Sequence, residues 1–281
     1  MNKWEVQELI LRTLKEDLGH QDMTTANLIP AGQEGTAKFL AKASGIVAGI
    51  EISQAVFTTL DSSINFEILK GDGEIIEAGE TIALVQGKIS TLLTGERLAL
   101  NFLQRLSGIA TKTNHMVEAI KYYKAEIVDT RKTTPGLRAL EKYAVRVGGG
   151  RNHRFGLYDG VMIKDNHIKA AGGINKAVIT LRQKVPHTLK IEVEVENLIQ
   201  LREALDAGVD IIMLDNMNIE DMKTAVEITA GKALLEASGG INESNLLEVA
   251  RTGVDFISAG ALTHSVSSLD ISFDIIQVEG A

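Results

Sequence analysis

The stretch KIEVEVENLIQLREALDAGVDIIMLDNMN, residues 190–218, holds two short apolar runs with a helical segment between them. Runs of the same kind recur before and after it, as AEIVD (125–129), GVMIK (160–164), ALLEAS (233–238) and DFISAG (255–260). Successive runs begin roughly 20 to 35 residues apart, which is the spacing of repeated βα units with parallel strands. Six strands are fewer than a closed eight-stranded barrel needs, so we predict an α/β fold with an open, incomplete βα barrel.

Polar, charged or glycine residues follow most of these strands. They are Thr130-Arg131-Lys132, Lys164-Asp165-Asn166, Asp215-Asn216, Ser238-Gly239-Gly240 and Ala259-Gly260-Ala261. In βα barrels the carboxyl ends of the strands open on one face, and the active site lies there. We therefore expect these residues to meet around one cavity.

The run KIEVEVE places three glutamates on one face of a strand, namely Glu192, Glu194 and Glu196. The other face is apolar and suits a position beneath helices, so the glutamates would point into the barrel. An unpaired carboxylate is costly there, and these side chains then need a bound metal or nearby cations. The candidate cations are Lys132, Lys164 and Arg154. The alternative is an edge strand with a solvated acidic face.

Two glycine-rich loops end the βα series. SGGINES (238–244) and SAGALTHS (258–265) each follow a strand and precede a helical segment. Backbone N–H groups at such turns bind phosphate, and βα barrels commonly build a phosphate site from their last two loops. Strand-to-helix turns also favour glycine without a ligand, so it is the succession of two loops that predicts a phosphate site.

Positive charge is concentrated in RVGGGRNHRF, residues 146–155, although the chain carries a formal net charge of −8. The acidic balance disfavours a nucleic-acid partner, which would need a broad basic surface. A small anion suits a local basic cluster better. The 281 residues contain no cysteine and no apolar run near the roughly 18 residues of a membrane span, so we expect a cytoplasmic protein without a membrane partner.

The first part of the chain has a different texture. Residues 1–20 predict an amphipathic helix, and residues 36–89 are typical of strands joined by glycine turns. Residues 94–123 predict a helix with a break at Ser107-Gly108.

Six stretches together resemble the quinolinate phosphoribosyltransferase family. They are NFLQRLSGIAT (101–111), DTRKTTPGLRALEKYAVRVGGGRNHRFGLYDGVMIKDNHI (129–168), EVEV (192–195), LDNM (214–217), EASGGI (236–241) and SAGALTHS (258–265). They occur in the family's order over nearly the whole chain, and the stretch Asp129–Ile168 is highly specific.

The resemblance implies a fold, an assembly and a reaction. The fold is an N-terminal α/β sandwich domain over residues 1–110, to which the tail 267–281 returns, and a phosphate-binding open βα barrel over residues 111–266. The family forms homodimers with shared active sites. It transfers phosphoribosyl from phosphoribosyl pyrophosphate to quinolinate in NAD biosynthesis, giving nicotinate mononucleotide, pyrophosphate and CO2, with Mg²⁺ as cofactor.

The resemblance also implies roles for particular residues. Arg131, His153 and Arg154 match positions that hold the quinolinate carboxylates. Lys132 and Lys164 match catalytic lysines near the phosphates and the reacting centre, while Glu194 and Asp215 match catalytic acids near the ribose hydroxyls and Mg²⁺. Further substrate-binding candidates are Thr133, Ser238, Gly239, Gly240, Ser258, Ala259 and Gly260.

Arg97 matches an arginine that the family lends to the neighbouring subunit. Helix periodicity alone predicts something else, because Arg97, Asn101 and Arg105 recur at four-residue steps and form a polar stripe that is typically solvated. For His153 the alternative is a packed or capping histidine.

Two other classes of protein share this architecture. One is a related barrel associated with molybdate transport, against which the intact DTRKTTPG and GGGRNHRFGL stretches argue. The other is a phosphate-binding βα barrel isomerase of amino-acid biosynthesis, which would not need a basic cluster for a dicarboxylate.

Overall fold

The computed structural model describes residues 3–279, and over this range no helix is long and apolar enough to cross a membrane. The chain divides into two compact units. The first comprises Met1–Lys112, Ala139–Gly148 and Val266–Ala281, and the second comprises Thr113–Arg138 and Gly149–Ser265. Each unit contains a β-sheet of its own.

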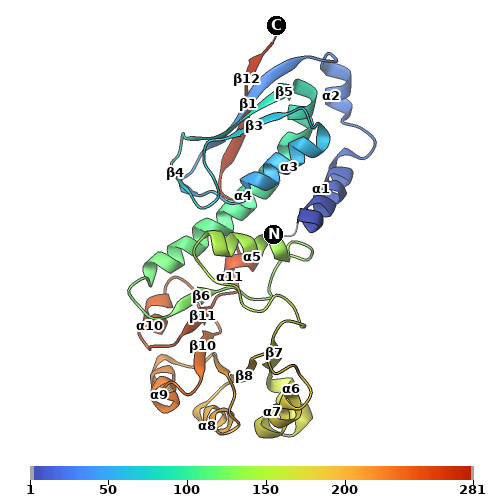
Figure 1. Cartoon of the computed structure of the whole chain (residues 1–281). Helices are drawn as coiled ribbons and strands as arrows, with labels where there is room; N and C mark the ends of the chain where they lie inside the picture. The colour runs from blue at the N-terminus through green and yellow to red at the C-terminus, as the bar shows by residue number, and fades with distance from the viewer. Residues whose placement is uncertain (1–2, 280–281) are drawn as a thin grey trace. The chain divides into compact units, whose positions relative to one another are not determined.

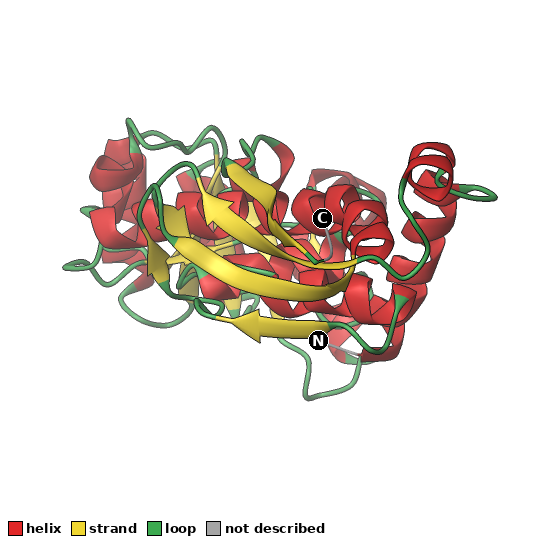
Figure 2. Ribbon diagram, turned by 90° about the horizontal axis from the view of Figure 1, so that it is seen from above, coloured by secondary structure: helices red, strands yellow, loops and turns green. Residues whose placement is uncertain are grey.

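The first unit is built on an antiparallel sheet with the strand order β12-β1-β5-β3 (Figure 1). Its strands are β1 (Glu34–Ala41), β3 (Asn65–Ile68), β5 (Thr81–Lys88) and β12 (Ile271–Val278), and a separate ladder joins β2 (Gly45–Ile46) to β4 (Ile75–Ile76). Fully buried residues alternate with more exposed ones along β1, as in a strand with one face on a core. β12 pairs antiparallel with β1, so the end of the chain adds an outer strand to this sheet, whose twist is visible in Figure 2.

Phenylalanines form the centre of the core in the first unit. Phe39, Phe66 and Phe273 come from the sheet, and Phe57 comes from helix α3 (Ile50–Leu60). The rings of Phe57 and Phe273 stack with their centroids 5.5 Å apart, and those of Phe39 and Phe273 meet edge to face at 4.9 Å. These aromatic contacts add to the hydrophobic burial that holds α3 on the sheet.

Helix α3 corrects the prediction that residues 36–89 are strands. The helix begins after Gly49, whose φ of 95° is in the left-handed region. The backbone N–H groups of Gly49 and Ile50 donate to the carboxylate of Asp72 at 2.8 and 2.9 Å. Because the capping carboxylate comes from a distant part of the chain, no local N-cap residue marks the start of the helix in the sequence.

The amphipathic helix predicted at the N-terminus is confirmed. Helix α1 (Lys3–Leu18) buries Leu9, Ile10 and Leu14 at three- and four-residue steps. The short helix α2 (Met23–Leu28) follows, and Asp22 caps it by accepting the N–H groups of Thr24 and Thr25.

Helix α4 (Ile89–Ala119) is continuous, so the predicted break at Ser107-Gly108 is wrong. The Ser107 hydroxyl accepts the backbone N–H of Ala48 at 3.0 Å. A Cβ atom at position 108 would overlap the carbonyl oxygen of Ser267. These two small residues therefore allow other backbone segments to approach the helix closely, and they do not end it.

Helix α5 (Arg138–Val147) is held by polar contacts within the first unit. Glu141 is fully buried and accepts the Arg105 Nε–H at 2.9 Å. The Tyr143 hydroxyl donates to Asp72 at 2.6 Å, and burial together with this carboxylate raises the pKa of Tyr143. Arg105 of the predicted solvated stripe is thus paired with a buried carboxylate.

The second unit contains six parallel strands in the order β6-β11-β10-β9-β8-β7 (Figure 1). They are β6 (Glu126–Val128), β7 (Val161–Ile163), β8 (Ile191–Val195), β9 (Ile211–Asp215), β10 (Leu234–Ser238) and β11 (Phe256–Ser258), and each lies in one of the predicted runs. Within residues 3–279, β6 and β7 end the sheet without pairing to each other. The predicted open barrel is therefore confirmed.

Helices alternate with these strands. They are α6 (Asp165–Ala171), α7 (Ile174–Arg182), α8 (Leu198–Asp206), α9 (Ile219–Thr229), α10 (Leu246–Ala250) and α11 (Ala261–His264). Figure 1 shows α7, α8 and α9 side by side in chain order, and neighbouring members of this set are in contact. On β8, the residues Ile191, Val193 and Val195 are completely buried, as expected of the strand face beneath the helices.

Candidate active site

The carboxyl ends of the barrel strands surround a cavity of about 560 Å³, which we call the mouth cavity. The predicted site residues that line it are Arg131, Lys132, His153, Arg154, Lys164, Glu194, Asp215, Ser238, Gly239, Gly240 and Ser258. Thr130, Met162, Met213, Asn216 and Glu236 complete the lining. The predicted gathering is confirmed for the strand-end residues named here, but Asp165, Asn166 and Ala259-Gly260-Ala261 do not line the cavity. The individual roles stay predictions.

Four of the predicted residues do not line this cavity. Thr133 accepts the Nε–H of Arg138 at 2.9 Å, and Ala259 is buried with its N–H donated to Val128. Gly260 lies against the Lys132 side chain, since a Cβ there would come within 2.9 Å of Lys132 Cδ. Arg97 belongs to the first unit, where its side chain is 62% exposed and lies 3.9 Å from Glu96.

A buried aspartate at the end of β6 holds the segment that carries His153 and Arg154. Asp129 is fully buried; one of its oxygens accepts the backbone N–H of His153 at 2.9 Å, and the other accepts the side-chain amide of Asn152 at 2.5 Å. Arg151 adds a parallel bridge to Val128 on the free edge of β6. The basic segment is therefore fixed to the sheet.

Arg131 and Arg154 both line the mouth cavity, and the charge of one acts on the other. Arg154 donates to the carbonyl oxygen of Gly160 at 3.2 Å and to the sulfur of Met162 at 3.6 Å. Burial lowers the pKa of Arg154, and the positive charge of Arg131 lowers it further. Two like charges that repel in a partly desolvated place are stabilised by an anion between them.

The loop that bears Arg131 is organised by Arg138. The Arg138 guanidinium donates to the carbonyl oxygen of Phe155 at 3.1 Å and to that of Arg131 at 3.3 Å. On the other side, the Thr263 hydroxyl donates to the carbonyl oxygen of Lys132 at 2.8 Å. The backbone around both basic residues is thereby held by contacts within the chain.

Two acidic side chains of the mouth cavity, Glu194 and Asp215, accept hydrogen bonds from neighbouring side chains. Glu194 accepts from the Lys164 ammonium group at 2.5 Å, so one of the predicted cations is confirmed as a partner of the β8 glutamates. Asp215 accepts from the side-chain amide of Asn216 at 2.9 Å. These contacts engage one oxygen of each carboxylate. Glu196, the third glutamate of the run, is exposed.

The loop after β10, where the sequence predicts a phosphate site, contains two glycines in the left-handed region. Gly239 and Gly240 have φ values of 92° and 62°, a region that favours glycine. Asn216 at the end of β9 also has a positive φ of 53°, and a Cβ on Gly239 would overlap its side-chain oxygen. The two strand ends are therefore packed so closely that a larger residue at position 239 would displace Asn216 or distort the loop.

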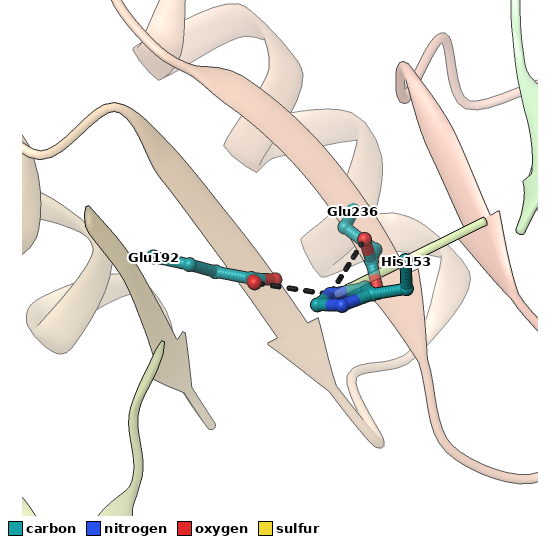
Figure 3. Close-up of side chains that lie close together, drawn as sticks. All are labelled: His153, Glu192 and Glu236. Carbon is teal, nitrogen blue, oxygen red and sulfur yellow. Dashed lines mark ion pairs between the residues drawn. The ribbon is translucent and has the colours of Figure 1, made fainter. Parts of the chain in front are cut away.

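A buried cluster of His153, Glu192 and Glu236 lies inside the barrel (Figure 3). The Nε2 atom of His153 is 3.0 Å from Glu192 Oε2 and 3.6 Å from Glu236 Oε2. Burial raises the pKa of Glu236 to about 7, and the negative charge of Glu192 adds to this effect. Glu192 thus has His153 as its ion-pair partner, and its charge also favours the charged form of Arg154, one of the predicted cations.

Asp129, Glu192 and Glu236 are not among the site residues that the sequence predicts. Asp129 ends an apolar run, and Glu236 lies within another, in ALLEAS. An acid inside a short buried strand is unusual because burial of its charge is costly, and this was the signal available. What could not be read from the sequence is that Glu236 on β10 and Glu192 on β8 face the same imidazole.

Comparisons with known proteins identify the family. The N-terminal domain of quinolinate phosphoribosyl transferase matches residues 22–107, and its C-terminal domain matches residues 109–274. A probable carboxylating nicotinate-nucleotide pyrophosphorylase from Synechocystis is 49% identical over 267 residues, which cover 94% of this chain and 90% of the relative. A probable enzyme of the same name from Bacillus subtilis is 48% identical over 275 residues, with 98% and 95% covered.

A solved structure of a protein with the same name has a very similar fold. The nicotinate-nucleotide pyrophosphorylase from Francisella tularensis superposes with a TM-score of 0.94 and 41% identity, covering 99% of this chain and 98% of that chain. Sequence and structure thus agree over almost the full length. The chain belongs to the quinolinate phosphoribosyltransferase family.

Proposed function

We propose that this chain transfers the phosphoribosyl group of phosphoribosyl pyrophosphate to quinolinate and releases pyrophosphate and CO2, giving nicotinate mononucleotide. Membership of the family supports this reaction. The observation that carries it is the pair of guanidinium groups of Arg131 and Arg154 at the mouth cavity. Quinolinate has two adjacent carboxylates, and the planar fork of arginine can meet each carboxylate with two parallel hydrogen bonds.

We assign the phosphates of the second substrate to the other side of the mouth cavity. The backbone of Ser238-Gly239-Gly240 and the ammonium group of Lys132 supply N–H donors there. As pyrophosphate leaves, negative charge grows on its oxygens, and Lys132 stabilises that charge. Lys164, paired with Glu194, lies on the wall where positive charge develops on the ribose. Glu194 and Asp215 stabilise that positive charge.

The chemistry on the ring needs no covalent enzyme intermediate. The pyridine nitrogen attacks the anomeric carbon while the bond to pyrophosphate breaks. The resulting pyridinium withdraws electrons, so the bond between C2 and its carboxylate breaks, CO2 leaves, and the electron pair on C2 takes up a proton. The protein's part is to hold the carboxylates and to exclude a misplaced ring.

Mg²⁺ is part of the proposal, with Glu194 and Asp215 as its protein ligands. Both are oxygen donors on the wall of the mouth cavity, and their contacts engage one oxygen of each carboxylate. Mg²⁺ commonly uses one or two carboxylates together with substrate phosphates and waters, so this donor set fits. The ion would neutralise charge on the leaving pyrophosphate.

Two further parts rest on the sequence resemblance. We propose a homodimer in which Arg97 of one subunit serves the active site of the other, which agrees with the exposure of its side chain within a single chain. We also propose a cytoplasmic location. Both substrates are small anions, and we propose no nucleic-acid or membrane partner.

The reaction is tested by mixing the purified chain with phosphoribosyl pyrophosphate, Mg²⁺ and quinolinate labelled with ¹³C in the 2-carboxylate. We expect nicotinate mononucleotide without the label and an equal amount of labelled CO2. The proposal is wrong if the label stays in the nucleotide, or if no nucleotide forms.

A further inference from the structure

The buried cluster of His153, Glu192 and Glu236 is not explained by the contacts of the substrates. Glu192 and Glu236 are 4% and 3% exposed, and the His153 side chain is 15% exposed. The Oε1 atoms of both glutamates are buried without a hydrogen-bond partner. Such atoms are uncommon in folded proteins because their desolvation is not compensated, so this arrangement has a cost in stability.

The two ring nitrogens of His153 face different groups. The backbone N–H of Arg154 donates to Nδ1 at 2.7 Å, and Nε2 lies 3.0 Å from Glu192 Oε2 (Figure 3). A neutral imidazole has one N–H donor and one acceptor. Since Nδ1 must accept from Arg154, the proton of the ring is on Nε2 and is donated to Glu192.

This tautomer is incompatible with a metal ion at the cluster, although the three ligand atoms lie within 4.8 Å of one another. A metal on Nε2 would need the lone pair of that nitrogen and would move the proton to Nδ1. The ring N–H and the Arg154 N–H would then face each other. Metal-bound histidines instead donate from their second nitrogen to an acceptor.

The cluster lies between two cavities. His153, Arg154 and Glu236 line both the mouth cavity and a second cavity of about 690 Å³, which also reaches Lys190, Ile211 and Phe256 at the other ends of the strands. At the edge of the sheet, Asp129 accepts the backbone N–H of His153. Inside the barrel, the contact with Glu192 holds the imidazole.

We propose that Glu192 and Glu236 are positioning residues for the quinolinate half of the active site. Glu192 accepts the Nε2–H of His153 and so fixes the tautomer and the orientation of the imidazole. Through its Nδ1, His153 in turn holds the N–H of Arg154, from which the guanidinium extends to the mouth cavity. Glu236 limits the positions that the imidazole can take. The proposal rests on the proposed function, because it assigns the Arg154 side of the cavity to quinolinate.

Kinetics of matched variants test the positioning role. Glu192→Ala removes the acceptor, and we expect KM for quinolinate to rise about tenfold, the scale of one lost hydrogen bond, with KM for phosphoribosyl pyrophosphate within about twofold of the original. Glu192→Gln keeps an acceptor and should recover most of the loss. Glu196→Ala changes an exposed glutamate of the same run and should leave both constants unchanged.

A second readout does not depend on turnover. The ¹⁵N resonances of the His153 ring, assigned by their loss in His153→Gln, should show an unprotonated Nδ1 and a protonated Nε2 in the full-length protein without substrate. Glu236→Gln should keep this pattern, because Glu192 and the Arg154 N–H remain. Addition of Zn²⁺ should leave these two resonances in place.

Several results would overturn the positioning role. They are a proton on Nδ1, a doubly protonated ring, Zn²⁺ binding that shifts these resonances, or equal changes in both KM values for Glu192→Ala. If Glu192→Ala does not fold, Glu192→Gln and the ring tautomer decide the question. A wild-type protein that makes no nicotinate mononucleotide refutes the proposed function instead, and the tautomer is still measured.

Discussion

At the scale of single residues, the proposed quinolinate site consists of positive groups whose backbone is held by contacts within the chain. The backbone of Arg131 is held by Arg138, and the backbone of His153 is held by the buried Asp129. Arg154 is half-buried, and its pKa is lowered by burial and by the charge of Arg131. Preorganised charges of this kind bind an anion without first rearranging.

Arg154→Lys tests the geometry of this anion site, because lysine keeps the charge and loses the planar fork. We expect KM for quinolinate to rise about tenfold while KM for phosphoribosyl pyrophosphate changes little. Arg151→Lys is the matched control on the same segment, since Arg151 is exposed and pairs with Glu126. Equal effects of the two substitutions, measured by steady-state kinetics, would argue against a fork-specific contact.

Glu236→Gln tests the charge inside the barrel. In the folded protein the pKa of Glu236 is raised to about 7, so Glu236 keeps its proton at pH values where the unfolded chain, with a pKa of about 4.5, has lost it. The wild type should therefore lose stability as pH rises from about 4.5 to 7, owing to burial and to the charges of Glu192 and Asp129.

The glutamine variant cannot ionise at position 236. Its melting temperature minus that of the wild type should increase across this pH window, as measured by thermal denaturation in a series of buffers. The Ser258 side chain, whose hydrogen bond favours the charged form of Glu236, reduces the size of the effect and does not change its sign. A difference that stays constant from pH 4.5 to 8 would refute the assignment of the raised pKa to Glu236.

The sequence predicts some of these residues and not others for a physical reason. Arg131, Lys164 and Asp215 follow strands, and the carboxyl ends of parallel strands meet at one face, so their meeting needed no knowledge of the packing. The contact of Glu192 and Glu236 with one imidazole depends on which inward side chains meet across the barrel. Neither spacing nor composition records that arrangement.

At the scale of helices and strands, the sequence pattern predicts an element correctly where the residues that bound the element are its neighbours in the sequence. The six parallel strands were each short apolar runs bounded by turn residues, and all of them form. Helix α3 was missed because its first N–H groups are capped by Asp72 from a distant loop. Ser107 and Gly108 predict a helix break that does not occur, because glycine has the same low helix propensity whether it ends a helix or allows a neighbouring segment to approach it.

Gly108→Ala separates these two roles of glycine in helix α4. By helix propensity alone, alanine would stabilise the protein by about 1 kcal/mol. The added Cβ would overlap the backbone carbonyl of Ser267, and overpacking typically costs about 1–3 kcal/mol. We therefore expect a net loss of stability in chemical denaturation. Asn101→Ala on the exposed side of the same helix is the control, and a stabilised Gly108→Ala would contradict the close packing.

At the scale of the whole molecule, the two compact units carry different parts of the proposed site. The mouth cavity belongs to the second unit, while Arg97 belongs to the first and is largely exposed. Periodicity alone assigns such an arginine to solvent. Only the family resemblance suggested a role in a neighbouring subunit, because one chain's sequence contains no record of its partner's position.

Complementation between two inactive variants tests the shared site. Arg97→Ala and Lys164→Ala should each lose activity while their fold and dimer persist. Mixed heterodimers should regain activity, because one of their sites receives both intact side chains. Near-normal activity of Arg97→Ala alone would indicate a solvated residue. Heterodimers that form by native mass spectrometry and stay inactive would exclude sharing.

We propose that Arg131 and Arg154 at the mouth cavity bind two adjacent carboxylates, and a comparison of quinolinate with nicotinate as substrates is the decisive measurement. Nicotinate lacks the 2-carboxylate and leaves part of the guanidinium pair of Arg131 and Arg154 without a carboxylate, which costs about 1–3 kcal/mol. With phosphoribosyl pyrophosphate and Mg²⁺ held constant, we predict that kcat/KM for nicotinate is at least about tenfold below that for quinolinate. Equal kcat/KM values for the two acids would contradict the account.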